Sequence, residues 1–401
     1  MTLRLMLWMT VAILCGFGLV VVVSATAGMT GSNATGTVTY AFLWKQMLAM
    51  AGGIAGAVAI SWWIGTDRLR STGWTALALA ATVLSLLAVL AVGRTVNGAK
   101  RWIDLGPVNL QPAELAKLSV VLAAAWYFAR YPHLTRTFWH GTLRPLLGFG
   151  LVAGLVYATK DLGSVVVMGV VFSVMLWYAG TRMLPYLMLV AAALPILFYT
   201  AAWSVGYRRD RMLSFMDPLN SDGPTAYHLK QGFIAMGGGG LWGTGLGQGT
   251  AKLGFVPEKH TDFIFAVICE EFGMVGGTGL AALYLVFIGI GLRIAATSRD
   301  LHRRLLAVGC TTVIGFQAFG NMLVVTGCVP TKGMTLPFIS YGGTSVAVCI
   351  VFAGILDAVA KANARDRLDG GVGTSATRGA VIKTHKTLSW SHGTTTNLGS
   401  S

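Results

Sequence analysis

The fold of this chain is decided where a polar loop runs into an apolar helix, in the segment Phe255-Val256-Pro257-Glu258-Lys259-His260-Thr261-Asp262-Phe263-Ile264-Phe265. The apolar sequence continues to about residue 292, which is longer than the ~20 residues that a helix needs to cross a bilayer. Asp262 therefore stands at a membrane boundary, and Glu270 and Glu271 lie within the same predicted helix. Because charge is costly in hydrocarbon, ionisable groups in such places commonly mark a pathway or a reaction.

Similar apolar stretches occur along most of the chain. Hydrophobic residues make up 54% of the sequence and charged residues only 11%, whereas soluble domains carry roughly 25% charged residues. Ten stretches predict membrane-spanning helices, at about 5–27, 41–64, 74–93, 113–130, 145–159, 162–180, 183–203, 263–292, 305–327 and 341–360. The fifth and sixth meet at Lys160-Asp161, which predicts a tight hairpin. The predicted fold is all-α and polytopic, with a transmembrane domain over residues 1–364.

Basic residues set the expected orientation. Arginines and lysines follow the second, fourth, sixth, eighth and tenth stretches, so they share one side if both termini are cytoplasmic. The net charge of +15 then reflects topology and contact with anionic lipid, and it does not indicate nucleic-acid binding. Most acidic residues fall on the opposite, outer side. Residues 365–401 are basic and rich in Gly, Ser and Thr, so we expect a disordered cytoplasmic tail.

A cleaved signal peptide is the alternative interpretation of the first apolar stretch. Arg4, the apolar run and Ala25-Thr26-Ala27 resemble a signal peptide with a small-residue cleavage site. The run is about 20 residues long, which exceeds a usual signal core and favours a retained helix.

The longest polar segment, residues 204–262, separates the seventh and eighth predicted helices and is too long for a simple connection. It opens with Tyr207-Arg208-Arg209-Asp210-Arg211, which is either a phosphate-binding cluster or an interfacial belt. Tyr227 to Met236 predicts a short amphipathic helix. The glycine-rich run 237–249 lacks the Lys-Ser/Thr of a nucleotide loop. It either binds an anion through backbone amides or lets another backbone approach closely.

Two other outer loops lead into predicted helices. In the loop at about 94–112, which contains Arg101, Gln111-Pro112 predicts a helix start. Glu114 and Lys117 then share one helix face, either as a structural ion pair or as part of a site. Residues 330–345 contain two prolines and three glycines at membrane depth. Because broken backbone is tolerated there only when it is buried or lines a watery cavity, Lys332 is expected to face the same cavity as Asp262.

Taken together, these segments resemble the SEDS family (shape, elongation, division and sporulation), which includes FtsW, RodA and SpoVE. The resemblance extends from the first to the tenth apolar stretch. It rests on Gly98–Trp102, Gln111–Leu118, Asp161-Leu162-Gly163, Pro257–Val267 with Glu270-Glu271, and Pro337–Ser345, in this order. The sequence around Lys332 is more similar to FtsW than to RodA. Two positions depart from the family: Lys160 replaces a common proline, and Asn109 stands where some members carry arginine.

The resemblance implies a peptidoglycan glycosyltransferase that polymerises lipid II at the outer face of the bacterial cytoplasmic membrane, in division or elongation. The implied partners are lipid II, a glycan on undecaprenyl diphosphate, a class B penicillin-binding protein and other proteins of the division or elongation complex. Mg²⁺ or Mn²⁺ is the one candidate cofactor, and the resemblance does not decide whether the reaction uses it.

The resemblance also assigns roles to residues. Asp262, in the sequence His-Thr-Asp, is the implied catalytic residue. Since pyrophosphate is a good leaving group, one general base suffices, unlike glycoside hydrolysis. The expected substrate-binding residues are Arg101, Glu114, Lys117, Asp161, Arg208, His260, Lys332 and Ser340, and the expected supporting residues are Gln111, Glu258, Thr261, Glu270 and Glu271. The alternative role for Asp262 is to stabilise a helix start, which is worth about 0.3–1 kcal/mol.

Two other function classes compete with an enzyme. A lipid flippase would also need a charged outward cavity, but it commonly carries internal repeats, and the two halves of this chain show none. A non-catalytic scaffold of a division complex would tolerate substitution of Asp262. The concentration of acidic residues on the outer side favours the enzyme.

Overall fold

The computed structural model describes residues 2–27, 35–96, 99–104, 106, 109–199, 215, 224–249, 261–330 and 333–388. Each of the ten predicted spans coincides with a helix in this part of the chain. The helices that coincide with the predicted spans are α1 (Thr2–Ala27), α2 (Thr35–Val58), α4 (Thr72–Val92), α5 (Pro112–Arg130), α6 (Arg144–Ala158), α7 (Leu162–Tyr178), α8 (Met183–Phe198), α11 (Ile264–Ala296), α12 (Leu301–Val325) and α13 (Gly343–Leu388). Shorter elements are η1 (Ala59–Ile64), α3 (Gly65–Leu69), η2 (Pro132–Leu134), η3 (Phe138–Leu143) and α10 (Pro224–Gly239).

Among the described residues, seven helical segments are long and apolar enough to cross a membrane: Thr2–Thr26, Tyr40–Leu69, Thr72–Val92, Phe138–Ala158, Ile264–Ala296, Leu301–Val325 and Gly343–Asp369. Helices α7 and α8 are apolar but shorter, and α5 carries two buried charges, Glu114 and Lys117. The predicted all-α, polytopic class is confirmed.

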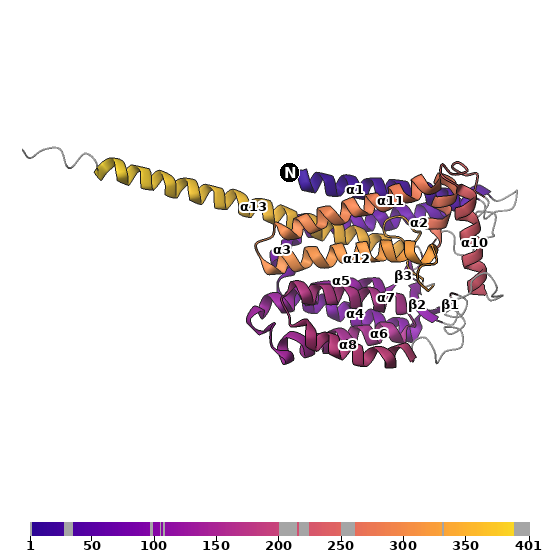
Figure 1. The fold of residues 1–401 in the computed structure, drawn as a ribbon, viewed down its shortest axis with the longest axis horizontal. Helices are drawn as coiled ribbons and strands as arrows, with labels where there is room; N and C mark the ends of the chain where they lie inside the picture. Colours follow the sequence, from indigo (N-terminus) through magenta and orange to yellow (C-terminus); the bar gives the residue numbers. More distant parts are fainter. Residues whose placement is uncertain are drawn as a thin grey trace, which may run out of the picture.

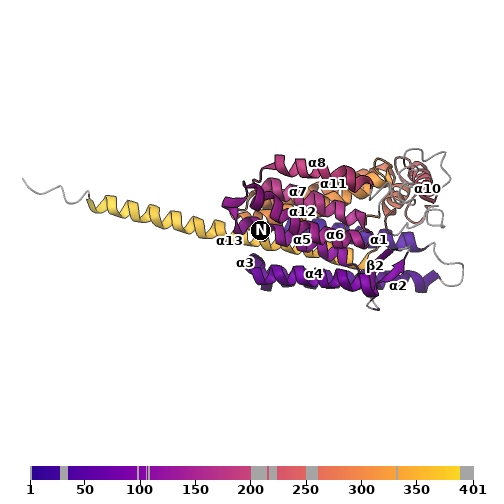
Figure 2. The same cartoon turned by 90° about the horizontal axis from the view of Figure 1, so that it is seen from below.

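The long helices run side by side, so the bundle has two ends (Figure 1). The N-terminus of α1 and the departing α13 mark one end, called the tail end here; α10 and the small sheet mark the other, called the loop end. Figure 2 shows the same two ends from below. Helix α10 lies across the loop end and does not run along the long helices (Figure 1), as expected of an amphipathic helix at a membrane surface.

The loop between α4 and α5 contains a small antiparallel sheet that the all-α prediction did not include. Its strands β1 (Arg94–Val96), β2 (Ala99–Asp104) and β3 (Asn109–Leu110) are joined in the order β1-β2-β3. Arg94 is paired with Trp102, and Asp104 with Asn109. The sheet holds Arg101 on its central strand, at the loop end of the bundle.

The tail differs from its prediction. We expected disorder over residues 365–401, but α13 continues as one helix to Leu388 and leaves the bundle (Figure 1). Residues 389–401 lie outside the described part of the chain. The packed turns of α13 supply a nucleus, and adding residues to a formed helix costs far less than starting one. Composition alone did not reveal this continuation.

A buried carboxylate joins three elements near the tail end. Asp357 of α13 is 1% exposed, and its two oxygens lie 2.6 and 2.8 Å from the Arg4 guanidinium of α1. Ser61 of η1 donates to the same carboxylate at 2.5 Å. The network ties the start of the chain to α2–η1 and α13.

Substituting Arg4 by Gln should lower stability by about 1.5–3 kcal/mol, because Asp357 then loses its charged partner while still buried. The guanidinium is 34% exposed, so screening by water keeps the loss below that of a fully buried pair. Thermal unfolding of purified protein in detergent measures this. Arg68→Gln, which removes an exposed arginine bonded only to a backbone carbonyl, is the control and should melt like the wild type.

Candidate active site

Asp262 lies just before α11, and the structure does not place it as a helix cap. Helix α11 begins at Ile264 and its N-cap residue is Phe263, so Asp262 stands one position too early. Its backbone carbonyl accepts a hydrogen bond of 2.8 Å from Asn321 Nδ2 of α12. The same nitrogen donates to the carbonyl of Met334 at 2.5 Å. Asn321, which the sequence analysis did not single out, therefore holds two loop segments together.

The carboxylate of Asp262 lies against the backbone of Gly333. A Cβ atom at residue 333 would stand 2.9 Å from Asp262 Oδ2, which is closer than real Cβ atoms approach. On its other side, the carbonyl of Gly333 would be 3.2 Å from a Cβ at Gly163, in the first turn of α7. Residue 333 thus lies between the Asp262 carboxylate and the start of α7, and any residue larger than glycine would displace a neighbour.

Gly333→Ala should therefore lower activity by about 10–100-fold, because even a 1 Å displacement of a reacting group can cost 10²-fold. The matched control is Gly342→Ala in the same segment, where a Cβ would meet its nearest neighbour, Ser345, at an ordinary 3.5 Å. The initial rate of the reaction that the family resemblance implies, glycan formation from lipid II, measures both variants. Equal rates for the two would show that Gly333 does not position Asp262.

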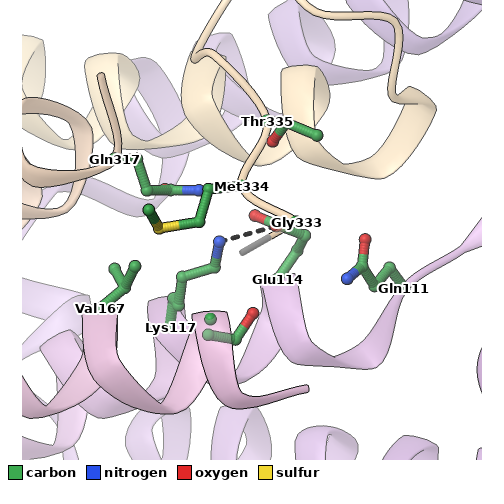
Figure 3. A pocket seen from close by; sticks show the side chains of 10 residues that line it. Gln111, Glu114, Lys117, Val167, Gln317, Gly333, Met334 and Thr335 are labelled. Atoms are coloured by element: carbon green, nitrogen blue, oxygen red, sulfur yellow. Dashed lines mark hydrogen bonds and ion pairs between the residues drawn. The ribbon is translucent and has the colours of Figure 1, made fainter. Parts of the chain in front are cut away.

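Beneath Gly333 is a small polar cavity of about 30 Å³ (Figure 3). Its lining comes from α5, α7, α12 and the segment before α13: Gln111, Glu114, Lys117, Gly163, Ser164, Val167, Gln317, Gly333, Met334 and Thr335. This volume suits one or two waters and not a sugar. Asp262 is not among the lining residues, so Gly333 separates its carboxylate from the cavity.

Glu114 and Lys117 form a buried ion pair at the floor of this cavity. Their charged atoms are 2.7 Å apart, and the two side chains are 5% and 1% exposed. Figure 3 shows the lysine pointing towards the carboxylate. The second oxygen of Glu114 and Oε1 of Gln317 are buried and have no hydrogen-bond partner among the described residues. Since buried polar groups are normally paired, water in the cavity is the natural partner for both. The predicted shared face of Glu114 and Lys117 is confirmed.

The hairpin between α6 and α7 anchors one wall of the cavity. Asp161 is the N-cap of α7 and accepts hydrogen bonds from the backbone and the hydroxyl of Ser164, at 3.0 and 2.9 Å. Gln111 Nε2 donates to the same carboxylate at 3.2 Å. Arg101 reaches over from β2 and donates to the carbonyl of Lys160 at 2.6 Å. Lys160 has a left-handed φ of 63°, so the predicted tight hairpin is confirmed.

Ser340 and Thr261 connect the segment before α13 to the segment before α11. The Ser340 hydroxyl donates to the carbonyl of Thr261 and accepts from the backbone of Leu336, both at 2.7 Å. The Ser340 side chain is buried, and Gln46 of α2 donates to its carbonyl at 3.3 Å. Ser340 thus holds the residue that precedes Asp262.

The glycine-rich run packs against a break in α11. Helix α11 is interrupted at Gly273, whose φ of 68° lies in the left-handed region. The backbone amides of Thr244 and Gly245 donate to the carbonyls of Glu270 and Glu271, at 2.9 and 3.1 Å. A Cβ on Gly273 would stand 2.3 Å from the carbonyl of Leu241. Of the two interpretations of this run, close backbone approach is the one that the structure supports.

Glu270 and Glu271 face the interior, as expected of supporting residues. They are 3% and 2% exposed. Ser24 of α1 donates to one oxygen of Glu271 at 2.6 Å, and the other oxygen has no partner in the protein. A Cβ on Gly249 would stand 2.6 Å from Glu270 Oε2, so this carboxylate lies directly under the glycine-rich run.

Four expected site residues, Arg208, Glu258, His260 and Lys332, lie outside the described residues. Within the described part of the chain, no group of three or more His, Cys, Asp or Glu side chains is arranged to hold a metal ion.

The bundle of long apolar helices defines a polytopic membrane protein, and the Asp262 carboxylate, held against Gly333 at the loop end, is its candidate site. Residues 4–365 match the family of cell cycle proteins FtsW/RodA/SpoVE. This chain belongs to that family, and the resemblance inferred from the sequence is confirmed.

Relatives and solved structures agree with this membership. The "probable peptidoglycan glycosyltransferase FtsW" of Geobacter metallireducens is 37% identical over 350 residues, which is 87% of this chain and 92% of that protein. The protein of the same name from Thioalkalivibrio sulfidiphilus is 38% identical over 88% of each chain. A solved chain described as "Structural coordination of polymerization and crosslinking by a peptidoglycan synthase complex" matches with a TM-score of 0.72 at 30% identity, covering 89% of this chain and 97% of that one. The rod shape determining protein RodA of Thermus thermophilus matches with a TM-score of 0.62 at 28% identity, covering 88% and 95%.

Proposed function

We propose that this protein is a peptidoglycan glycosyltransferase that polymerises lipid II at the outer face of the bacterial cytoplasmic membrane, in cell division. The observation that carries the proposal is the fixed position of the Asp262 carboxylate. Its backbone is bonded to Asn321 and its side chain rests on Gly333, at the loop end of the bundle. A reaction on a membrane-anchored substrate needs such a group at the depth of the lipid headgroups. Both termini are then cytoplasmic, which agrees with the distribution of basic residues.

In the proposed reaction, the 4-hydroxyl of the GlcNAc of lipid II attacks the anomeric carbon of the glycan donor. Asp262 accepts the hydroxyl proton as the new C–O bond forms. The bond from the anomeric carbon to the pyrophosphate oxygen breaks, and the lipid pyrophosphate leaves with the electron pair. No second carboxylate is needed to protonate this leaving group, because it is already a stable anion.

Positive charge near the site stabilises the departing pyrophosphate. Arg101 is suited to direct contact, since it is partly exposed on the sheet that covers this end. Lys332, which is expected to face the same cavity as Asp262, lies outside the described residues. Lys117 is buried and paired with Glu114, so it acts across the cavity and not by direct contact in this arrangement. The polar groups of Ser340 and Asp161 form hydrogen bonds within the protein, so we propose that these residues position the segments around the site. A Mg²⁺ or Mn²⁺ ion, if the reaction uses one, would add positive charge at the pyrophosphate.

The proposed partner is a class B penicillin-binding protein, which crosslinks the strands that this enzyme makes. The resemblance to a chain of a peptidoglycan synthase complex supports such an arrangement.

Purified protein supplied with lipid II tests the function. We expect glycan polymer, with or without the cognate transpeptidase, and the assay is repeated with Mg²⁺, Mn²⁺ and chelator. If every partner and metal condition yields no polymer from well-folded protein, the enzyme proposal fails. Translocation of lipid II across vesicles would then support a flippase, and its absence a scaffold.

A further inference from the structure

A second hollow lies at the opposite, tail end of the bundle, between three helices. Its volume is about 380 Å³, far more than the 30 Å³ of the cavity near Asp262. Thr2, Leu3 and Met6 line it from α1, Arg293 and Thr297 from the end of α11, and Arg367 from α13. Small-molecule sites commonly occupy about 300–1,000 Å³, so a lipid headgroup fits here.

Among the described residues that line the hollow, two are arginines and none is acidic. Among the described residues, neither Arg293 nor Arg367 forms an ion pair. Two other arginines at this end differ in this respect: Arg4 of α1 is paired with Asp357, and Arg303 of α12 with Asp366 at 2.8 Å. Three acids of this end, Asp300, Asp357 and Asp366, are thus occupied by other arginines, while Arg293 and Arg367 line a space that is open to an anion. Guanidinium groups bind phosphate oxygens in two-pronged geometry, which makes phosphate a fitting ligand.

An apolar face continues from the hollow along α1. Leu5, Met9 and Ile13 are 61%, 55% and 54% exposed, and their spacing of four residues places them on one side of the helix. Met6, which lines the hollow, is 48% exposed beside them. Since α1 is a membrane-spanning helix, this face meets hydrocarbon. A ligand that combines a phosphate with an acyl chain satisfies both parts of the surface.

We propose that this hollow binds an anionic phospholipid from the adjacent leaflet, with its phosphate between Arg293 and Arg367 and an acyl chain along α1. The bound lipid would join α1, α11 and α13 at the point where α13 leaves the bundle (Figure 1). Basic pockets between transmembrane helices on the cytoplasmic side are a general means of holding anionic headgroups. The proposal is independent of the catalytic role of Asp262.

The experiment compares lipid retention by the full-length protein and matched arginine variants. Delipidated protein is titrated with phosphatidylglycerol, and bound lipid is counted by native mass spectrometry. The variants in the hollow are Arg293→Gln and Arg367→Gln, singly and together. The controls are Arg299→Gln and Arg365→Gln, which remove the same charge from exposed positions at the same end but do not line the hollow. Phosphatidylcholine with the same chains and inorganic phosphate are tested in parallel.

We expect one tightly held phosphatidylglycerol on the wild type and on both controls. Each substitution in the hollow should lower the affinity for phosphatidylglycerol about fivefold, and the double variant about 25-fold, because one arginine charge contributes roughly 1 kcal/mol to binding of an anionic lipid. Equal lipid retention by the variants in the hollow and the control variants would overturn the proposal, because the arginines would then only help to set the orientation of the helices in the membrane. Equal binding of phosphatidylcholine would overturn the anionic assignment. If millimolar inorganic phosphate displaces the bound phosphatidylglycerol, the hollow is a site for free phosphate and not for a lipid.

Discussion

Asp262→Asn should reduce glycan polymerisation by about 10²–10⁴-fold, the range that a positioned general base contributes. The amide has nearly the same size and keeps the contact with Gly333, so the local backbone should not move. It has no basic lone pair near neutral pH to accept the hydroxyl proton. The bond that Asn321 donates goes to the backbone carbonyl of residue 262 and survives the substitution. Initial rates with lipid II, at equal protein and partner concentrations, measure the loss.

The control for this variant is Asp104→Asn, an acid at the same end of the bundle that lies on the sheet. Asp104 is exposed and its carboxylate caps only the backbone of Gly106. Its polymerisation rate should stay within twofold of the wild type. Lipid II binding and thermal unfolding should be unchanged in both variants. A folded Asp262→Asn protein that polymerises at the wild-type rate would rule out the general base and favour a scaffold.

The transmembrane helices could be predicted because each leaves a local signal, an apolar run with polar ends. The Lys160-Asp161 hairpin was likewise visible as two spans with almost no sequence between them. The sheet was not predicted because its strands are two to six residues long and carry no strong alternation. The extension of α13 beyond residue 364 was missed because its sequence resembles a linker, with glycines at 370, 371 and 373.

The site was predictable only where its contacts are local. Glu114 and Lys117 are three residues apart, so helix periodicity alone brings them together. Asn321 and Gln317 gave no such signal, because a single amide in an apolar helix resembles any buried polar residue. Asn321 lies 59 positions from Asp262, and only the tertiary fold brings the two together. The sequence also carried no signal for Gly333, because glycine is required there only by the Asp262 carboxylate that lies against it in the fold.

Lys117→Met should destabilise the protein by about 3–5 kcal/mol, the usual cost of leaving one member of a buried ion pair alone. The Glu114 carboxylate would keep its burial while losing the ammonium at 2.7 Å, and its second oxygen already lacks a protein partner. Thermal unfolding in detergent measures the effect. Lys45→Met in α2 is the control, since that lysine is exposed, and it should change stability by less than about 0.5 kcal/mol.

The double variant Glu114→Gln/Lys117→Met separates the structural role of the pair from its catalytic one. Removing both charges avoids an isolated buried ion, so most of the stability should return. The net charge of the cavity is unchanged in this variant, so only the lost ammonium of Lys117 can affect the pyrophosphate. Polymerisation should therefore stay about 10-fold below the wild type, less than for the loss of a donor in direct contact. If the double variant regains both stability and full activity, the pair serves only the fold. Arg101 and Lys332 would then have to supply all of the positive charge near the leaving group.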